Sequence, residues 1–353
     1  MDVMNVAFVV PRSGPAGIFG PSCETCGELA VEEINASGGV LGRELRLETV
    51  DGGGHPLGVA AEVDRLVTAG RVQAVTGWHI SAVRQEVAPH TAGRIPYVYT
   101  PLYEGGERTP GVFLTGETPA HQVLPALRWL AEELGVRTWC IVGDDYVWPR
   151  ASAAAVRRFV ASCGSEIRDE MFVALGTEEF GPTLRRVERS GADGVLMFLV
   201  GMDAVRFNRA FTEMGLDDTC VRFSPLMDEN MLLATGSANT RGLYAAAGFF
   251  EMLPTPESLD FGLRYHRRFG VDAPTLNAPG ESCYEGLTLL RRLAERADSL
   301  ELRRMCAAAE GTVTYESPRG VVSLHRNHLA QRVYLARAQG LEFDVLAELA
   351  GGS

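Results

Sequence analysis

The sequence contains no lysine, so all 33 of its basic residues are arginine. This absence excludes enzymes that form a Schiff base or bind pyridoxal phosphate through a lysine, and it excludes the phosphate-binding GK[ST] loop. The arginines are outnumbered by 45 acidic residues, which leaves a formal net charge of −12. A nucleic-acid-binding surface needs a basic face, so this balance argues against one.

The sequence also lacks long apolar runs and a regular cysteine framework. No stretch approaches the ~18 consecutive apolar residues of a membrane helix, and the first residues lack the charged region and cleavage site of a signal peptide. The seven cysteines are scattered and odd in number, whereas a secreted disulfide framework is even and clustered. We therefore expect a reducing, cytoplasmic location. The alternative is a periplasmic protein or extracellular lipoprotein whose signal has been removed.

The 353 residues suggest about two domains at roughly 150 residues each. Short apolar runs such as Asn5–Val10 and Val72–Thr76 alternate with helical patterns such as Cys23–Ala36 and Val59–Thr68. This alternation predicts an α/β fold, with parallel strands covered by helices on both faces. The same alternation resumes after Pro119, so we expect a second sheet of the same build.

The last part of the chain follows a different pattern. Three helical stretches lie between residues 256 and 308, and a β ribbon is expected from residue 320 onward. Because no linker separates the two predicted sheets, we expect two lobes that share crossing segments. Residues 1–118 and 252–320 are assigned to lobe 1, and residues 119–251 and 321–353 to lobe 2.

Candidate ligand-binding residues follow the predicted strands, because ligands of open parallel sheets bind beyond the carboxyl ends of the strands. Five such segments carry polar or aromatic groups: Ser13–Phe19, Trp78–Ser81, Tyr99–Glu104, Asp145–Trp148 and Leu226–Glu229. Ser81 lies between a strand and a helix, where its hydroxyl could cap the helix or contact a ligand. The first N–H groups of that helix could donate to a carbonyl or carboxylate oxygen.

Four aromatic residues among these segments suit a small ligand: Tyr99, Tyr103, Tyr146 and Trp148. Phenol hydroxyls can bond its polar atoms and the rings can enclose an apolar tail; the alternative is packing within a lobe. Phe19 could likewise cover the ligand or lie in the core. Asp228 could accept a hydrogen bond from an amide or ammonium group, although carboxylates are favoured near helix starts by the helix dipole alone.

Several possible chemistries lack their motifs. Cys23 and Cys26 form one CxxC without a second pair, so we expect thiols that line the loop or the core. The seven histidines are dispersed, and we expect neither a metal nor a cofactor. No G-x-S-x-G motif is present, and we do not expect an enzyme.

Four segments resemble a known family. Residues 32–43 (EEINASGGVLGR) resemble the end of the first helix in type I periplasmic binding proteins. The segments 103–105 (YEG) and 145–150 (DYVWPR) resemble the urea and short-chain-amide branch, and 51–56 (DGGGHP) resembles the amide sensor of the aliphatic amidase operon. The resemblance spans nearly the whole chain. It implies two Rossmann-like lobes, joined by hinge crossovers, that close on a small ligand in the cleft without catalysing a reaction.

The resemblance also implies roles for single residues. The serine equivalent to Ser81 is a ligand donor, and Tyr99 and Trp148 match aromatic pocket positions. The amide sensor has a tyrosine at the position of Trp148 and another at that of His79. Thr100 could replace a threonine contact of the sensor that this sequence lacks. His79 and Thr100 are therefore added to the candidate ligand-binding residues.

The resemblance implies a cytoplasmic sensor of short amides. Such a sensor holds an antitermination regulator of an amidase or nitrile-degradation operon and releases it when the ligand binds; a homodimer is compatible with this function. The alternative is the substrate-binding component of an ABC importer for urea, short-chain amides or branched-chain amino acids. These ligands differ by a few atoms, so the sequence leaves the ligand open.

Overall fold

The computed structural model describes residues 2–349 and divides the chain into two compact units. Lobe 1 comprises Met1–Leu102, Gly106–Gly116 and Pro254–Gln331; lobe 2 comprises Tyr103–Gly105, Glu117–Leu253 and Arg332–Ser353. The sequence assigned residues 321–331 to lobe 2. The structure instead places them in the lobe 1 sheet, because they form antiparallel strands that pair within it.

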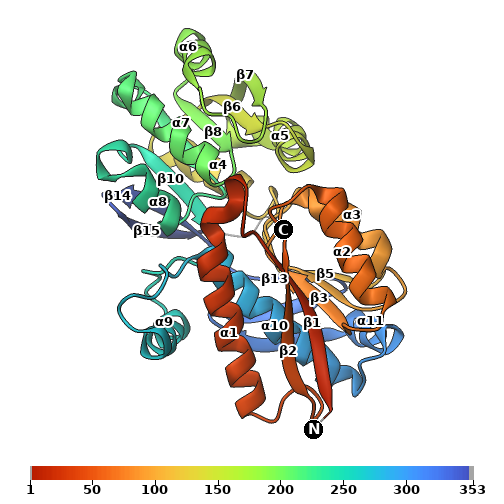
Figure 1. The fold of residues 1–353 in the computed structure, drawn as a ribbon. Helices are drawn as coiled ribbons and strands as arrows, with labels where there is room; N and C mark the ends of the chain where they lie inside the picture. Colours follow the sequence, from red (N-terminus) through yellow and green to blue (C-terminus); the bar gives the residue numbers. More distant parts are fainter. Residues whose placement is uncertain (1, 350–353) are drawn as a thin grey trace. The chain divides into compact units, whose positions relative to one another are not determined.

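The lobe 1 sheet has eight strands in the order β11-β12-β13-β5-β4-β3-β1-β2. Their bounds are β1 Val3–Val10, β2 Glu44–Asp51, β3 Ala74–Gly77, β4 Tyr97–Tyr99, β5 Val112–Leu114, β11 Thr312–Ser317, β12 Gly320–His325 and β13 His328–Ala330. Strands β1 to β5 are parallel. The second strand lies on one side of β1 and the third on the other (Figure 1). The point at which the strand order reverses is the topological switch point, where ligands of such sheets bind.

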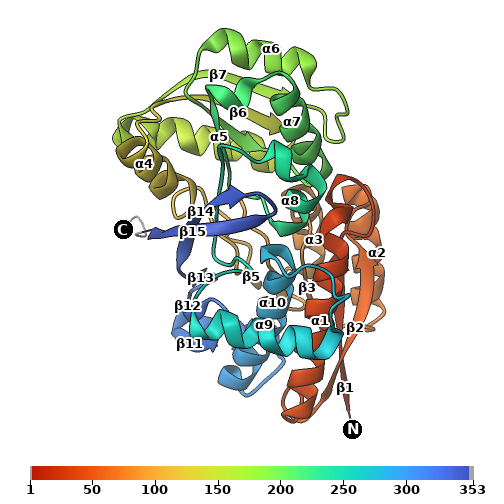
Figure 2. The ribbon, with the colours of Figure 1, turned by 90° about the vertical axis from the view of Figure 1, so that its left-hand side faces the viewer.

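Helices cover both faces of the lobe 1 sheet. They are α1 Gly20–Ala36, α2 Pro56–Thr68, α3 Ser81–Thr91, α9 Pro256–Phe269, α10 Ala278–Ala297 and α11 Leu302–Glu310, with the 3₁₀ turn η1 Pro15–Phe19. Because crossovers between parallel strands are right-handed, the reversal at β1 puts α1 on one face and α2 and α3 on the other. Helix α10 packs against α1, as Figures 1 and 2 show.

The approach of α10 to the lobe 1 sheet depends on one glycine. A Cβ atom on Gly286 would lie 2.5 Å from both Thr76 Oγ1 and Thr100 Cγ2, so only glycine allows this spacing. After Gly286, the apolar face of α10 is fully buried in the hydrophobic core of lobe 1 through Leu287, Leu290 and Leu293.

The lobe 2 sheet has seven strands in the order β15-β14-β10-β9-β8-β6-β7. Their bounds are β6 Thr138–Asp144, β7 Glu166–Val173, β8 Gly194–Phe198, β9 Val221–Ser224, β10 Leu243–Ala247, β14 Val333–Gln339 and β15 Glu342–Leu349. The helices are α4 Val123–Glu133, α5 Val147–Phe159, α6 Gly181–Ser190, α7 Met202–Glu213 and α8 Glu229–Thr235, with 3₁₀ turns Val160–Cys163, Leu216–Asp218 and Ser237–Asn239. Here β6 is the switch point, with β7 on one side and β8 on the other (Figure 1).

The α/β class with two lobes is confirmed, but the sheets are mixed rather than fully parallel. Strands β14 and β15 run antiparallel to their neighbours, as do β11 and β12. The sequence did not predict the three-residue strands β5 and β13, which are too short to show a period. Within residues 2–349, no helix is both long and apolar enough to cross a membrane.

Candidate functional site

The carboxyl ends of β1 and β3 meet at the lobe 1 switch point. Gly77, at the end of β3, has φ +130°, and a Cβ atom there would lie 2.2 Å from the carbonyl oxygen of Val9. Glycine therefore permits the backbone after β3 to lie against β1. This contact brings Trp78–Ser81 beside the segment that leads from β1 into η1.

Phe19 and Trp78 form an aromatic pair at this point. Their ring centroids lie 4.6 Å apart at an interplanar angle of 60°, an edge-on contact within lobe 1. The sequence analysis named Phe19 as a candidate ligand-binding residue, whereas Trp78 was only the first residue of the candidate segment Trp78–Ser81. Its position directly after β3 is the signal that could have identified it.

Ser81 is the first residue of α3, not its cap. The N-cap is Ile80, with extended backbone (φ −66°, ψ 155°), and its own side chain makes no capping hydrogen bond. Ser81 is therefore not the N-cap residue that the sequence offered as one alternative, because the helix has already begun at Ser81. Its Oγ lies 3.4 Å from the Tyr99 hydroxyl and 3.5 Å from Arg84 Nη1. We name Phe19, Trp78, Ser81 and Tyr99 the lobe 1 cluster.

His79 is fully buried and both of its ring nitrogens have partners inside lobe 1. Nδ1 lies 3.1 Å from the carbonyl oxygen of Val9, and Nε2 lies 2.6 Å from the Tyr97 hydroxyl. A carbonyl oxygen only accepts, so Nδ1 carries the proton and Tyr97 donates to Nε2. Burial lowers the pKa of His79 to about 4, so the ring is neutral at pH 7. Both ring nitrogens of His79 are therefore occupied by protein groups and not by a ligand.

Tyr99 and Thr100 are also engaged within lobe 1. The Tyr99 hydroxyl donates to the carbonyl oxygen of His79 at 2.9 Å. The Thr100 hydroxyl accepts from Ser282 Oγ of α10 at 3.1 Å. Thr100 therefore faces helix α10, and this hydrogen bond holds the chain in place directly after β4.

A buried ion pair lies next to the lobe 1 cluster. Arg84 Nε is 3.1 Å from Glu107 Oε2, and the side chain of Arg84 is only 3% exposed. The guanidinium also lies 5.0 Å from the centre of the Tyr99 ring. Glu107 offsets the charge of Arg84, so this ion pair is close to neutral overall. The sequence analysis did not identify this pair.

In lobe 2, Tyr146 and Trp148 follow the switch-point strand β6. Their ring centroids are 6.3 Å apart, and Trp148 meets Phe198, at the end of β8, edge-on at 5.6 Å. Gly143 permits this packing, because a Cβ atom there would lie 2.9 Å from Pro149 Cβ. The two aromatic residues are thus held against the carboxyl ends of β6 and β8.

Tyr103 and Asp228 belong to lobe 2 as well. The Tyr103 N–H donates to the carbonyl oxygen of Glu117 at 2.8 Å, which ties residues 103–105 to lobe 2. Asp228 is the N-cap of α8, and its Oδ1 accepts from the Met231 N–H at 2.8 Å. The position of Asp228 at a helix start therefore gives one of its two carboxylate oxygens a partner without any ligand. We name Tyr146 and Trp148 the lobe 2 cluster.

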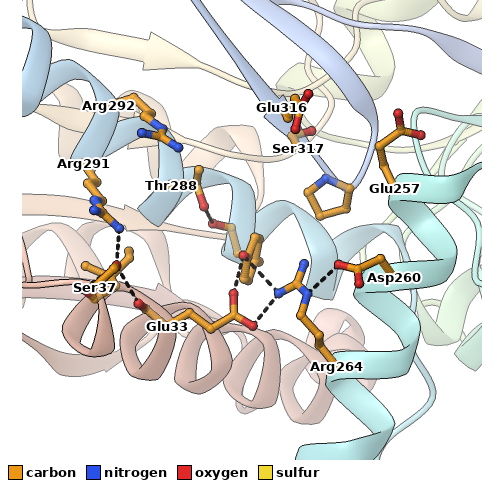
Figure 3. Close-up of a pocket in the computed structure, with 13 residues that line it drawn as sticks. Glu33, Ser37, Glu257, Asp260, Arg264, Thr288, Arg291, Arg292, Glu316 and Ser317 are labelled. Carbon is orange, nitrogen blue, oxygen red and sulfur yellow. Dashed lines mark hydrogen bonds and ion pairs between the residues drawn. The ribbon is translucent and has the colours of Figure 1, made fainter.

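A cavity of about 350 Å³ lies elsewhere in lobe 1, between α1, α9, α10 and β11. Figure 3 shows Arg264 between the carboxylates of Glu33 and Asp260. Tyr284 also donates to Glu33 Oε2, at 2.6 Å. Arg264 and the two carboxylates neutralise one another, so these side chains cross-link helices α1, α9 and α10. Cys23 and Cys26 are buried in the core of the same lobe, as expected.

The two clusters are suited to binding rather than to catalysis. Each combines aromatic rings with neutral or internally bonded polar groups, and each lies at a topological switch point. Among residues 2–349, no group of three or more His, Cys, Asp or Glu side chains is arranged to hold a metal ion. This fold and these clusters define a two-lobed small-molecule-binding protein.

The family model for periplasmic binding proteins matches residues 3–342, so the chain belongs to that family. It is 25% identical over 343 residues to the "Leu/Ile/Val-binding protein homolog 6" of Brucella melitensis, which covers 95% of this chain and 87% of the relative.

Two solved structures share the fold. One is a solute-binding protein of an ABC transporter from R. palustris in complex with 4-hydroxybenzoate, with a TM-score of 0.87 and 22% identity over 99% of this chain and 96% of that one. The other is a branched-chain amino acid transporter substrate-binding protein from Streptococcus pneumoniae in complex with isoleucine. Its TM-score is 0.85 at 17% identity, and the match covers 99% of both chains.

Proposed function

We propose that this protein is the substrate-binding component of an ABC importer and that it binds a small carboxylate with an apolar body, such as a branched-chain amino acid. In this proposal the carboxylate accepts hydrogen bonds from the start of α3 and from Ser81. Phe19 and Trp78 supply the rings of lobe 1 for the apolar body, and Tyr146 and Trp148 are the candidate rings of lobe 2. The importer takes the place of the amide sensor as the main hypothesis, because the named relatives are solute-binding proteins.

The observation that carries this proposal is the start of α3 at the lobe 1 switch point. The positive end of a helix dipole favours anions, and its first N–H groups point along the helix axis toward them. Arg84 is paired with Glu107, so it is the helix end and Ser81 that recognise the charge. A carboxylate gains from this arrangement more than a neutral amide does.

The experiment is a thermal-shift panel on the full chain with isoleucine, leucine, 4-hydroxybenzoate, butyramide, acetamide and urea. A ligand that binds only the folded state raises the Tm. We expect at least one of the carboxylates to raise it and urea to leave it unchanged. A response to the amides alone would reject the carboxylate proposal in favour of the sensor, and silence from all six would reject both.

The amide sensor is the second candidate, and the segment Asp145–Arg150 favours it. This segment positions Tyr146, whose phenol could bond a neutral amide, at the lobe 2 switch point. The sensor would act in the cytoplasm with a regulator protein as its partner, whereas the importer component acts outside the inner membrane. Cell fractionation of the native host separates these two locations.

A further inference from the structure

Lobe 2 contains a buried pair of carboxyl groups next to its ligand-binding cluster. Asp144 is the last residue of β6 and Asp203 lies in the first turn of α7, and both are fully buried. Asp144 Oδ2 accepts from the Val200 N–H at 2.8 Å, and Asp203 Oδ2 accepts from the Gly176 N–H at 2.6 Å. Each carboxyl group thus uses one oxygen to hold a backbone amide.

The second oxygen of Asp144 lacks a donor. Asp144 Oδ1 is buried and has no hydrogen-bond partner among residues 2–349. Val200 links the two residues, because its N–H donates to Asp144 Oδ2 and its carbonyl oxygen accepts from the Asp203 N–H at 3.1 Å. Two ionised carboxylates are acceptors only, so they cannot bond each other. One proton on the pair supplies the missing donor and removes the repulsion between two buried like charges.

The charged side chain near the pair does not replace the shared proton as a donor to Asp144. Arg206, one turn further along α7, reaches Asp203 Oδ1 with its Nη1 at 3.4 Å, and it is shared with Glu178 at 3.8 Å. From the neighbouring loops, backbone N–H groups face the pair. Burial, and next the charge of Asp203, raise the pKa of Asp144 well above its usual value, and burial also raises the pKa of Asp203.

The pair connects three loops at the carboxyl edge of the sheet. Val200 belongs to the loop between β8 and α7, and Gly176 to the loop between β7 and α6. The third loop leads from β6 into α5 and carries Tyr146, whose N–H donates to the carbonyl oxygen of Asp144 at 3.0 Å. The position of Tyr146 and Trp148 therefore depends on Asp144, which also holds the Val200 loop, while Asp203 holds the Gly176 loop.

We propose that Asp144 and Asp203 share one proton and that this pair positions the lobe 2 cluster for the ligand. The inference rests on the proposed function, because it assumes that Tyr146 and Trp148 contact the ligand. When the proton leaves to solvent as the pH rises, two buried negative charges repel each other and the three loops separate. The protein then binds its ligand less tightly, and Asp144 and Asp203 act as positioning residues.

The first test is the pH dependence of ligand affinity in wild type and Asp144→Asn. The asparagine keeps an oxygen for the Val200 N–H and donates permanently from its amide to Asp203. As the pH rises through the transition, we expect the wild-type affinity for isoleucine to fall roughly tenfold more than that of Asp144→Asn, a typical coupling. The ammonium group of isoleucine titrates equally with both proteins, so the difference between them reports on the pair. An equal fall in both proteins would overturn the proposal.

The second test needs no ligand, and so it distinguishes failure of this inference from failure of the proposed function. It follows tryptophan fluorescence of the free protein against pH, with Trp148→Phe to identify the contribution of Trp148. We expect a transition in wild type that is absent in Asp144→Asn. A transition that persists in Asp144→Asn rejects the shared proton even if no ligand of the panel binds.

A matched control is Asp193→Asn. Asp193 also accepts backbone N–H groups, from Arg137 and Thr138 at 3.0 and 2.9 Å, but at the amino ends of the same strands. It shares the chemistry of Asp144 without contacting the lobe 2 cluster. We expect this variant to keep the wild-type fluorescence transition and the wild-type fall in affinity. Loss of either in Asp193→Asn would mean that any lost carboxylate disturbs the lobe, which contradicts a specific role for Asp144.

Discussion

At the scale of single residues, Ser81 shows what a pattern in the sequence can and cannot establish. Its place between an apolar strand and a helical pattern was visible in the sequence, and the structure puts it at the start of α3. Its conformation was not visible, because the helix begins one residue earlier than a serine cap requires. The hydroxyl lies near the Tyr99 hydroxyl and Arg84 Nη1, which the sequence did not reveal.

Replacing Ser81 with alanine tests its proposed contact with the ligand. A hydrogen bond to a charged group contributes about 1.5–3 kcal/mol, so we expect Ser81→Ala to weaken binding of the carboxylate roughly 10- to 100-fold. Ser81→Thr keeps a hydroxyl and should retain most of the affinity. Calorimetric titration of both variants measures the difference. Equal affinities of wild type and Ser81→Ala would remove Ser81 from the site.

His79 makes the stability of the protein depend on pH. Its pKa is lowered to about 4 by burial, below the value of an unfolded histidine. The unfolded state therefore binds more protons between pH 6.5 and 4, and stability falls as the pH falls through this window. The shift corresponds to roughly 3 kcal/mol.

We expect His79→Gln to flatten this part of the pH profile, as measured by urea unfolding between pH 7 and pH 4. His325→Gln is the control, because His325 is exposed on β12, and its profile should follow wild type. A wild-type slope in His79→Gln would show that other groups produce the acid sensitivity.

At the scale of secondary-structure elements, hydrophobic periodicity predicted the long elements well and the short ones poorly. Helix α2 was predicted from Val59 and begins at Pro56, where proline is favoured in the first turn. Helix α1 was predicted from Cys23 but begins at Gly20, because Gly20 and Pro21 are not typical of a helix interior. Strands β5 and β13 have three residues each, too few to display alternation.

The same limit applies to the candidate site. Strand ends could be predicted, and they placed Ser81 and Trp148 at the two switch points. The direction of each side chain could not be predicted, because it depends on distant partners. His79 turns inward to the carbonyl of Val9, and Thr100 turns to Ser282, 182 residues away in the sequence.

Gly286 provides an element-scale test of the contact between α10 and the sheet. A methyl group there would lie 2.5 Å from atoms of Thr76 and Thr100, so we expect Gly286→Ala to lower the free energy of unfolding by about 1–3 kcal/mol. Gly262, in α9, has open space around its Cα. We expect Gly262→Ala to raise stability by up to about 1 kcal/mol. Urea denaturation compares the two, and a stabilised Gly286→Ala would contradict the tight contact.

At the scale of the whole molecule, the chain makes three main crossings between lobes, after residues 116, 253 and 331, besides the short segment 103–105 that also belongs to lobe 2. Arg319, nearly fully buried in lobe 1, holds two of these departure points. Its Nη1 donates to the carbonyl oxygen of Thr115 at 3.1 Å and to the side chain of Gln331, while Nε donates to Glu281 Oε2 at 2.6 Å. One side chain thus fixes, within lobe 1, the ends from which the first and third crossings begin.

Removing Arg319 should be costly because it leaves Glu281 charged and buried. We expect Arg319→Met to lower the free energy of unfolding by about 3–5 kcal/mol, and the double variant with Glu281→Leu to recover part of that loss. Equilibrium unfolding in urea measures both. A double variant that is less stable than Arg319→Met alone would show that the pair stabilises the lobe in some way other than mutual compensation.

The central claim is that this chain is a receptor for a small carboxylate. Calorimetric titration of the full chain with isoleucine, with butyramide in parallel, tests it most directly. The account predicts saturable binding of isoleucine, weakened in Ser81→Ala, and much weaker binding of butyramide. Saturable binding of butyramide with no heat from isoleucine would contradict the account.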